Sequence, residues 1–249
     1  MRNSLSNNHI IYFMVFCNMV YSFFSFGQIE ETMKQKVFYS LDEAMKNPDQ
    51  VYRLKLQKKK LKQIPAEVFL FKNLYELNLS HNKIKEMPEQ ICLLNGLHIL
   101  NISHNKLTDI PFSLGELDSL TILNLSKNKL NMLPSSIGML KSLTTLDASS
   151  NKITLLPSSV GNLLQLKTLI INQNNLTSIP AETGNLMALN YLDLWGNAIS
   201  TLPREIGKLI ATLKELDMRV MPVNFENQKY IQDLLPYTQI YFSKSCNCQ

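Results

Sequence analysis

The chain repeats one pattern of leucines and polar residues every 23 residues. An asparagine marks each period, at Asn82, Asn105, Asn128, Asn151, Asn174 and Asn197. A proline keeps the same step, at Pro65, Pro88, Pro111, Pro134, Pro157, Pro180 and Pro203. A period this regular indicates a stack of equivalent supersecondary units, each of which buries its apolar side chains against its neighbours.

Each period contains a short alternating segment that predicts a β-strand. In the copy at 77–80, Leu77 and Leu79 should point inward while Asn78 and Ser80 point outward, because side chains alternate along a strand. We count about eight such strands, centred near Leu54, Leu77, Leu100, Leu123, Leu146, Leu169, Leu192 and Leu216. They should form one parallel sheet with a spacing of about 4.8 Å.

The segment after each strand contains the pattern Pro-x-x-Ile-Gly and must return the chain to the next strand. These return segments are bulkier than the strands, so we expect the sheet to lie on the concave side of the stack. The predicted fold is an α/β solenoid, with a curved parallel β-sheet on the concave side and short helical or 3-10 return segments on the convex side. It should occupy residues 51–223 as one elongated domain.

The repeated asparagine has a structural explanation. Its amide both donates and accepts hydrogen bonds, so it can satisfy backbone groups where the strand turns away. We interpret Asn82, Asn105, Asn128, Asn151, Asn174 and Asn197 as a ladder that joins one repeat to the next. The matching positions at the two ends hold Lys59 and Met221, as expected for atypical end repeats.

Two flanking segments should cap the apolar ends of the stack. In the lead-in at 28–50, Ser40 and Glu43 match a helix-capping box, with Leu41, Ala44 and Met45 on one face and an end at Asn47 before Pro48. Residues 224–242 predict a helix from Asn224 to Leu235 and a strand from Thr238 to Phe242. The helix residues expected to pack on the last repeat are Phe225, Ile231, Leu234 and Leu235. Residues 243–249 are expected to be disordered.

Residues 1–27 have the composition of a secretory signal peptide. Arg2 precedes the apolar segment Ile10 to Phe24, and Ser25 and Gly27 occupy the −3 and −1 positions of a cleavage site before Gln28. The leader predicts a secreted or cell-envelope protein. An uncleaved leader that anchors the chain in a membrane is the alternative, and only then do we expect membrane association.

Charge and cysteines exclude several classes of function. The formal net charge is +5, with a basic run at one end made of Arg53, Lys55, Lys58, Lys59, Lys60 and Lys62. This run either attracts an acidic partner or is the solvated surface of the terminal repeat. It is short and lacks interleaved aromatic residues, so nucleic-acid binding is not expected. Cys92 occupies the position that glycine fills in later repeats, which indicates a small packing residue, and Cys246 and Cys248 are too close for an easy mutual disulfide.

No catalytic motif occurs in the sequence, and we expect neither a cofactor nor a metal. The one histidine pair, His81 and His104, lies one repeat apart, but Lys58 and Lys127 flank it in the same row and oppose metal binding. The triplets that match glycosylation sequons, such as Asn78-Leu-Ser80, follow from the repeat consensus.

The variable outward positions of the strands are the candidate binding surface. Trp195, the single tryptophan, lies outward with Tyr191, Asp193, Ile170 and Arg219 around it, and tryptophan, tyrosine and arginine often dominate binding at interfaces. The further candidates on this face are Asp147, Asp217, Ile99 and Ile122. The alternative is that Trp195 only packs against its strand neighbours.

The motif Leu133-Pro-Ser-Ser-Ile-Gly-Met-Leu140 in 23-residue steps resembles the Ras-group scaffold subclass of leucine-rich-repeat proteins and the repeats of plant disease-resistance proteins. With Asn47-Pro-Asp-Gln-Val51 before the repeats and Leu234-Leu-Pro-Tyr-Thr-Gln-Ile-Tyr-Phe242 after them, the chain is similar to short exported bacterial members over residues 40–242. The resemblance implies a non-enzymatic protein-binding module whose partner stays unidentified. We expect an exported, monomeric protein, and an intracellular or membrane-tethered signalling scaffold is the alternative.

Overall fold

The computed structural model describes residues 35–243 of the chain. Two compact units divide the chain, Met1–Lys36 and Val37–Gln249, and the second contains all the elements below. The predicted signal peptide at 1–27 lies outside the described residues, as do residues 244–249 of the predicted disordered tail. Ser243, the first residue of that tail, is described: its hydroxyl accepts a hydrogen bond of 2.6 Å from the Val220 N–H.

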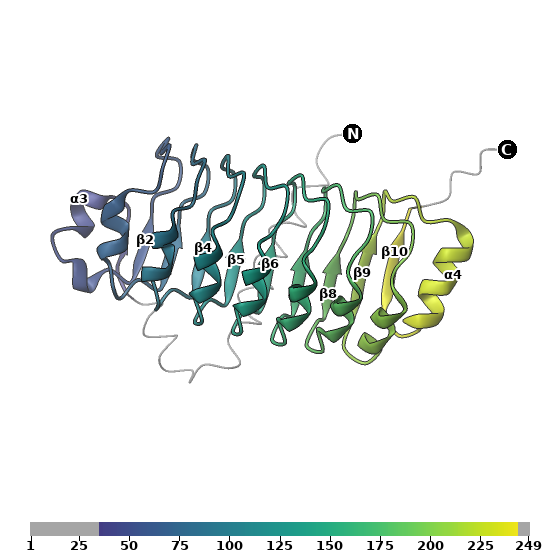
Figure 1. Ribbon diagram of the computed structural model, residues 1–249. Coiled ribbons are helices and arrows are strands. Elements are labelled where there is room, and N and C mark those ends of the chain that lie inside the picture. Colours follow the sequence, from purple (N-terminus) through teal and green to yellow (C-terminus); the bar gives the residue numbers. More distant parts are fainter. Residues whose placement is uncertain (1–34, 244–249) are drawn as a thin grey trace. The chain divides into compact units, whose positions relative to one another are not determined.

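The second unit is built on one parallel sheet of ten strands in sequence order, so each strand pairs with the strands of the repeats before and after it (Figure 1). This arrangement confirms the predicted solenoid. The strands are β1 Val37–Phe38, β2 Arg53–Lys55, β3 Glu76–Asn78, β4 Ile99–Asn101, β5 Ile122–Asn124, β6 Thr145–Asp147, β7 Thr168–Ile170, β8 Tyr191–Asp193, β9 Glu215–Met218 and β10 Gln239–Phe242. The eight repeat strands are β2 to β9. The sequence predicted β10, but not the two-residue β1.

Short 3-10 helices return the chain on the other side of the core (Figure 1). They are η3 Ala66–Leu70, η4 Glu89–Leu93, η5 Phe112–Glu116, η6 Ser135–Met139, η7 Ser158–Asn162, η8 Ala181–Asn185 and η9 Arg204–Leu209. Each follows the periodic proline, whose carbonyl accepts the first turn bond, as from Ile137 N–H to Pro134 at 3.0 Å. The last helix, η9, has six residues instead of five, which accommodates the extra residue between Leu209 and Leu213.

The core is a continuous column of leucines and isoleucines between the strands and the 3-10 helices. Leu77, Leu100, Leu123, Leu146 and Leu169, each from the middle of its strand, are all fully buried. One buried cluster runs from Phe38 to Leu235. Burial of these side chains is the main force that holds successive repeats together.

The N-terminal cap differs from its prediction in length. Helix α3, Leu41–Ala44, begins at Ser40, whose hydroxyl accepts a 3.3 Å hydrogen bond from the Glu43 N–H. It ends three residues before the predicted Asn47, because the chain turns into the 3-10 helix η2, Pro48–Gln50. In this short helix Ala44 is buried, whereas Met45 is exposed and the prediction that it shares the covering face is wrong.

The C-terminal cap is helix α4, Phe225–Leu234, followed by β10. Asn224 begins the helix by accepting a 2.8 Å hydrogen bond from the Asn227 N–H. Ile231 and Leu235 are buried against the last repeat, and Leu234 is half-buried. Phe225 is 82% exposed, so its predicted packing is wrong. At about 100° per residue it lies roughly 120° around the helix from Ile231.

The residue before each ladder position takes a left-handed backbone conformation. The φ angles lie between 50° and 68° for Lys58, His81, His104, Lys127, Ser150, Gln173, Gly196 and Val220. Only one of these residues is glycine, so the sequence did not reveal the turn. The conformation ends each strand at the same point in every repeat and therefore aligns the side chains that follow.

Candidate protein-binding face

The ladder asparagines bridge adjacent repeats through both ends of their amides. Asn128 Oδ1 accepts from the Leu107 N–H at 3.0 Å, and its Nδ2 donates to the carbonyls of Ile102 at 3.1 Å and Leu125 at 2.9 Å. The same bonds, shifted by one repeat each time, are formed by Asn82, Asn105, Asn151, Asn174 and Asn197. These residues are structural, because the amides are used up in joining the repeats.

The outward strand positions form continuous rows across the sheet. The first row is Val37, Arg53, Glu76, Ile99, Ile122, Thr145, Thr168, Tyr191, Glu215 and Gln239. The second row is Lys55, Asn78, Asn101, Asn124, Asp147, Ile170, Asp193, Asp217 and Tyr241. We call this surface the outer face of the sheet; it is the face that the sequence predicts to be concave.

Most second-row side chains turn back onto their own chain. Asp147 Oδ1 accepts from the Ser149 N–H at 3.0 Å, Asp193 Oδ1 from the Trp195 N–H at 3.0 Å, and Asp217 Oδ1 from the Arg219 N–H at 3.0 Å. This is the Asx-turn geometry, in which the side chain caps the residue two positions on. The asparagines of the sequon-like triplets form the same bond. The spacing Asx-x-Ser was the sequence signal for it at residues 78, 101, 124 and 147, whereas Asp193 and Asp217 precede Trp195 and Arg219.

These hydrogen bonds give the three acidic candidates a structural role. Asp193 and Asp217 are buried, and Asp147 is half-buried. Asp193 Oδ2 also accepts from Asn172 Nδ2 at 2.6 Å. The main role of the three carboxylates is therefore to fix the strand ends, and they present little surface for contact with a partner.

The aromatic candidates gather at the C-terminal part of the outer face. Tyr191 and Trp195 belong to the β8 repeat, with Ile170 on β7 and Arg219 after β9, so neighbouring repeats bring them together. Ile170, Tyr191 and Trp195 are half-buried, and Arg219 is exposed. Half-buried aromatic rings keep area for a partner while being held by their neighbours.

Tyr241 belongs to the same group but was missed by reasoning from the sequence. It lies opposite Asp217 on β10, and the Arg219 guanidinium carbon is 5.7 Å from the centre of its ring. Arg219 Nε also contacts both carboxylate oxygens of Asp217, at 3.0 and 3.1 Å. The alternation in the predicted strand from Thr238 to Phe242 was the available signal. We call Ile170, Tyr191, Trp195, Arg219 and Tyr241 the aromatic cluster.

Ile99 and Ile122 lie on the same face but not in the aromatic cluster. They are adjacent, half-buried first-row residues of β4 and β5. Strands β6 and β7 separate them from β8. The nine sequence candidates therefore divide into an apolar pair, three strand-capping carboxylates and four members of the aromatic cluster.

At the first repeats, Glu76 neutralises part of the basic run. Its Oε2 lies 2.7 Å from Arg53 Nε, and its Oε1 lies 2.9 Å from Lys55 Nζ. Lys58, Lys59, Lys60 and Lys62 remain exposed beyond the strand. The basic run thus has two parts: residues on the strand that form ion pairs with Glu76, and exposed lysines after the strand.

The His81 and His104 rings stack with their centres 3.9 Å apart. Burial lowers the pKa of His104, and the nearby His81 and Lys127 lower it further.

Among residues 35–243, no three His, Cys, Asp or Glu side chains come together as a possible metal site. Cys92, on η4, is a free, half-buried thiol. In the same described part of the chain, no helix is long and apolar enough to cross a membrane.

Asp193 is expected to cost stability at neutral pH. Burial raises its pKa from 3.8 to about 6, and Asp217 and Asp147 add to this, while the bonds from Asn172 and Trp195 oppose it. The folded state thus prefers the protonated acid, so stability is full below pH 3.8 and falls as pH rises through about 6. Because an amide can also accept from Trp195, Asp193→Asn should raise the unfolding free energy above pH 6 by on the order of 1–2 kcal/mol.

Urea unfolding at a series of pH values measures this effect. The advantage of the Asp193→Asn variant should shrink as the pH falls toward 3.8 and vanish well below it, where Asp193 is protonated in both states. An advantage that stays constant with pH would contradict the assignment.

Comparisons with known proteins agree with the fold. Two family models match the chain. The model described as leucine rich repeat matches residues 49–107, and the model described as leucine-rich repeat region matches residues 113–235. This chain is a leucine-rich-repeat protein. Domains of this family generally mediate protein–protein interaction and are typically non-enzymatic. No curated protein matches the chain.

Many solved structures share this fold. An internalin (inlF) from Listeria monocytogenes is 22% identical, with a TM-score of 0.62 over 81% of this chain and 64% of the internalin. The ectodomain of the Arabidopsis thaliana receptor kinase GASSHO1/SCHENGEN3, in complex with Casparian strip integrity factor 2, is 27% identical. Its TM-score is 0.65, over 86% of this chain and 27% of that ectodomain. This chain therefore corresponds to only part of either protein.

Proposed function

We propose that this protein is an exported, non-enzymatic binding module whose protein partner docks on the outer face of the sheet. The observation that carries the proposal is the aromatic cluster. Tyr191 and Trp195 belong to the β8 repeat, and Arg219 follows β9, where its guanidinium carbon lies 5.7 Å from the centre of the Tyr241 ring on β10. These residue types supply most of the binding energy in many interfaces, because they bury large areas with few rotatable bonds.

The geometry favours a partner over simple packing as the role of this cluster. Each ring is held by its neighbours yet keeps part of its surface open. Asp217 and Tyr241 hold the Arg219 side chain, which lowers the entropy lost when it binds. The plant ectodomain was solved with a bound partner, which supports a protein ligand for a similar domain.

Export rests on the sequence of residues 1–27. The mature chain should begin at Gln28, and N-terminal sequencing of the protein from its native source tests this. A chain that retains Met1 would favour the membrane-tethered or intracellular scaffold instead.

Trp195→Ala is the test of the binding face. Affinity capture from the native environment with the mature chain, followed by mass spectrometry, identifies the partner. That partner should then bind the variant at least about 30-fold more weakly, because a central tryptophan is worth about 2 kcal/mol or more. Circular dichroism should be unchanged.

Tyr237→Ala is the matched control. Tyr237 is 81% exposed in the turn between α4 and β10, outside both rows of the outer face. Its loss should leave the affinity unchanged. Equal affinity of the Trp195→Ala variant and the native chain would show that the partner binds elsewhere.

A further inference from the structure

A column of five lysines runs along one edge of the sheet. Each follows a ladder position, at Lys60, Lys83, Lys106, Lys129 and Lys152. The backbone N–H groups of the last four donate to the carbonyls of Leu61, Ile84, Leu107 and Leu130 in the preceding repeats, at 2.7 to 2.9 Å. These bonds place one lysine at the same point of each repeat, about 4.8 Å from the next.

A second basic column lies on the other side of the ladder asparagines. Its members are the left-handed residues Lys58, His81, His104 and Lys127. Their N–H groups form another ladder, to the carbonyls of Ser80, Ser103, Ser126 and Ser149 at 2.9 to 3.1 Å. The stacked histidine rings show how closely these side chains follow one another. We call the two columns together the lysine strip.

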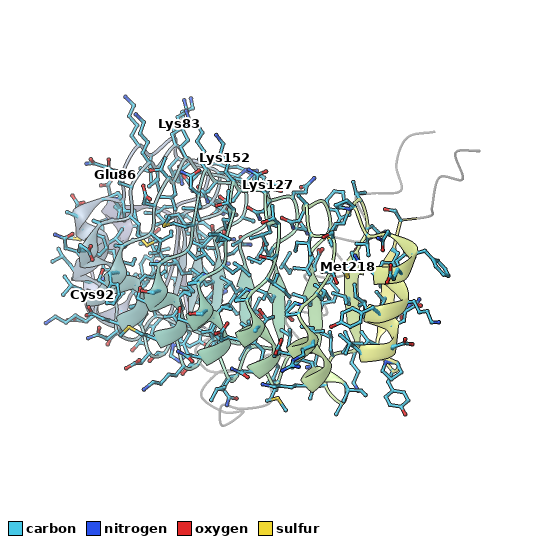
Figure 2. All side chains as sticks on the ribbon, turned by 45° about the vertical axis from the view of Figure 1, so that its right-hand side comes forward. Lys83, Glu86, Cys92, Lys127, Lys152 and Met218 are labelled. Carbon is cyan, nitrogen blue, oxygen red and sulfur yellow. The ribbon has the colours of Figure 1, made fainter. Side chains whose placement is uncertain are left out.

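The lysine strip is open and unneutralised. All seven of its lysines are exposed, and none forms an ion pair with another residue in 35–243. Lys83 and Lys152 project from one edge, clear of the ribbon (Figure 2). Lysines whose backbones lie about 5 Å apart repel one another, so an anionic ligand would relieve a cost that the folded protein carries.

The strip is also bounded. The next positions of the first column are Asn175 and Ala198, and those of the second are Ser150, Gln173 and Gly196, all uncharged. The strip therefore covers the repeats of β2 to β6, whereas the aromatic cluster lies on the repeats of β7 to β10. The two surfaces are separate.

We propose that the lysine strip binds a linear acidic polysaccharide that runs across the repeats, with its carboxylate or sulfate groups facing successive lysines. The strip is narrow and its lysines recur once per repeat, which fits a chain with regularly repeated charges. Its only aromatic rings are those of His81 and His104, which stack on each other, and it carries no Phe, Tyr or Trp platform for bases, which disfavours single-stranded nucleic acid. A flat anionic membrane would also have to meet the exposed Glu86 and Asp109, three residues after Lys83 and Lys106.

Heparin oligosaccharides of defined length are the probe, with affinity measured by calorimetry at several salt concentrations. Affinity should rise with chain length until the sugar spans about 19 Å, the length of the strip, and then level off. Lys106→Gln should reduce the slope of log affinity against log salt by about 1, and the affinity near 0.15 M salt roughly five-fold.

Lys141→Gln is the matched control, since it removes the same charge. Lys141 is exposed between η6 and β6, at the opposite ends of the strands, and its loss should change neither slope nor affinity. Trp195→Ala should also bind heparin normally, which separates this surface from the protein-binding face.

Three outcomes would overturn the proposal. The first is no binding of heparin at low salt. The second is an equal effect of Lys106→Gln and Lys141→Gln, which indicates diffuse attraction by net charge. The third is tighter, strip-dependent binding of single-stranded DNA of matched length or of phosphatidylglycerol vesicles, which assigns the strip to nucleic acid or to a membrane.

Discussion

Replacing Leu146 by alanine is expected to lower the free energy of unfolding by about 2–5 kcal/mol. Leu146 lies in the middle of β6, with a fully buried side chain between Leu123 and Leu169. Alanine would remove apolar contacts with both neighbouring repeats and leave a cavity at the centre of the sheet. Urea unfolding followed by circular dichroism measures the loss.

The position of Leu146 gives this substitution a long-range effect. When the repeats unfold together, the stability of the array includes every interface between neighbours, so weakening one interface lowers the stability of the whole array. We therefore expect the entire transition to move to lower urea. Leu155→Ala is the control: it removes the same atoms from a 62% exposed side chain and should change the unfolding free energy by less than about 0.5 kcal/mol. Equal effects of the two variants would show that burial in the stack is not what stabilises the domain.

Gly138→Ala is expected to destabilise the domain by about 3 kcal/mol or more, by overpacking. A Cβ at this position would lie 2.2 Å from the Ser159 carbonyl oxygen and 2.9 Å from its carbon. Those are backbone atoms of the next 3-10 helix, so they can move away only if η6 and η7 separate. The glycine is needed because the return helices touch, and no unusual φ angle is involved.

Gly96→Ala provides the comparison, because a Cβ there would meet its nearest atom, the Leu74 carbonyl oxygen, at 3.8 Å. It should leave the thermal midpoint almost unchanged while Gly138→Ala lowers it. The same close approach occurs at Gly115, Gly161 and Gly184, whereas Gly207 faces α4 with more room. Cys92 occupies this position in an earlier repeat. The tight contact therefore belongs to the repeats from Gly115 to Gly184, and a small shift of Tm for Gly138→Ala would contradict it.

Much of the fold could be predicted because the sequence shows two periods, the two-residue alternation along each strand and the 23-residue repeat. The alternation of Leu77 and Leu79 with Asn78 and Ser80 reports which side chains point inward. The 23-residue step reports which residues meet across the sheet, as Leu100 meets Leu123. Both patterns depend on the inward leucines and the repeat length, so substitutions at the outward positions leave them unchanged.

Other features depended on contacts that no local pattern records. The strand β1 forms because Val37 and Phe38 reach the open edge of β2, and its two residues are too few to show an alternation. The left-handed turns escaped notice because histidine, lysine and even Val220 occupy a position where glycine is expected. The end of α3 at Ala44 was decided by how the chain packs before β2.

The sequence by itself determined the class of this protein. It showed the repeat length, the sheet order, the buried leucines and the asparagine amides that join one repeat to the next. Only the tertiary structure decided which exposed groups act together. Tyr241 lies beside Arg219 because β10 pairs with β9. Lysines that are 23 residues apart become neighbours because parallel stacking places equivalent atoms about 4.8 Å apart. The physical reason is that burial of leucines specifies the stack, while the stack alone brings distant side chains within range of one another.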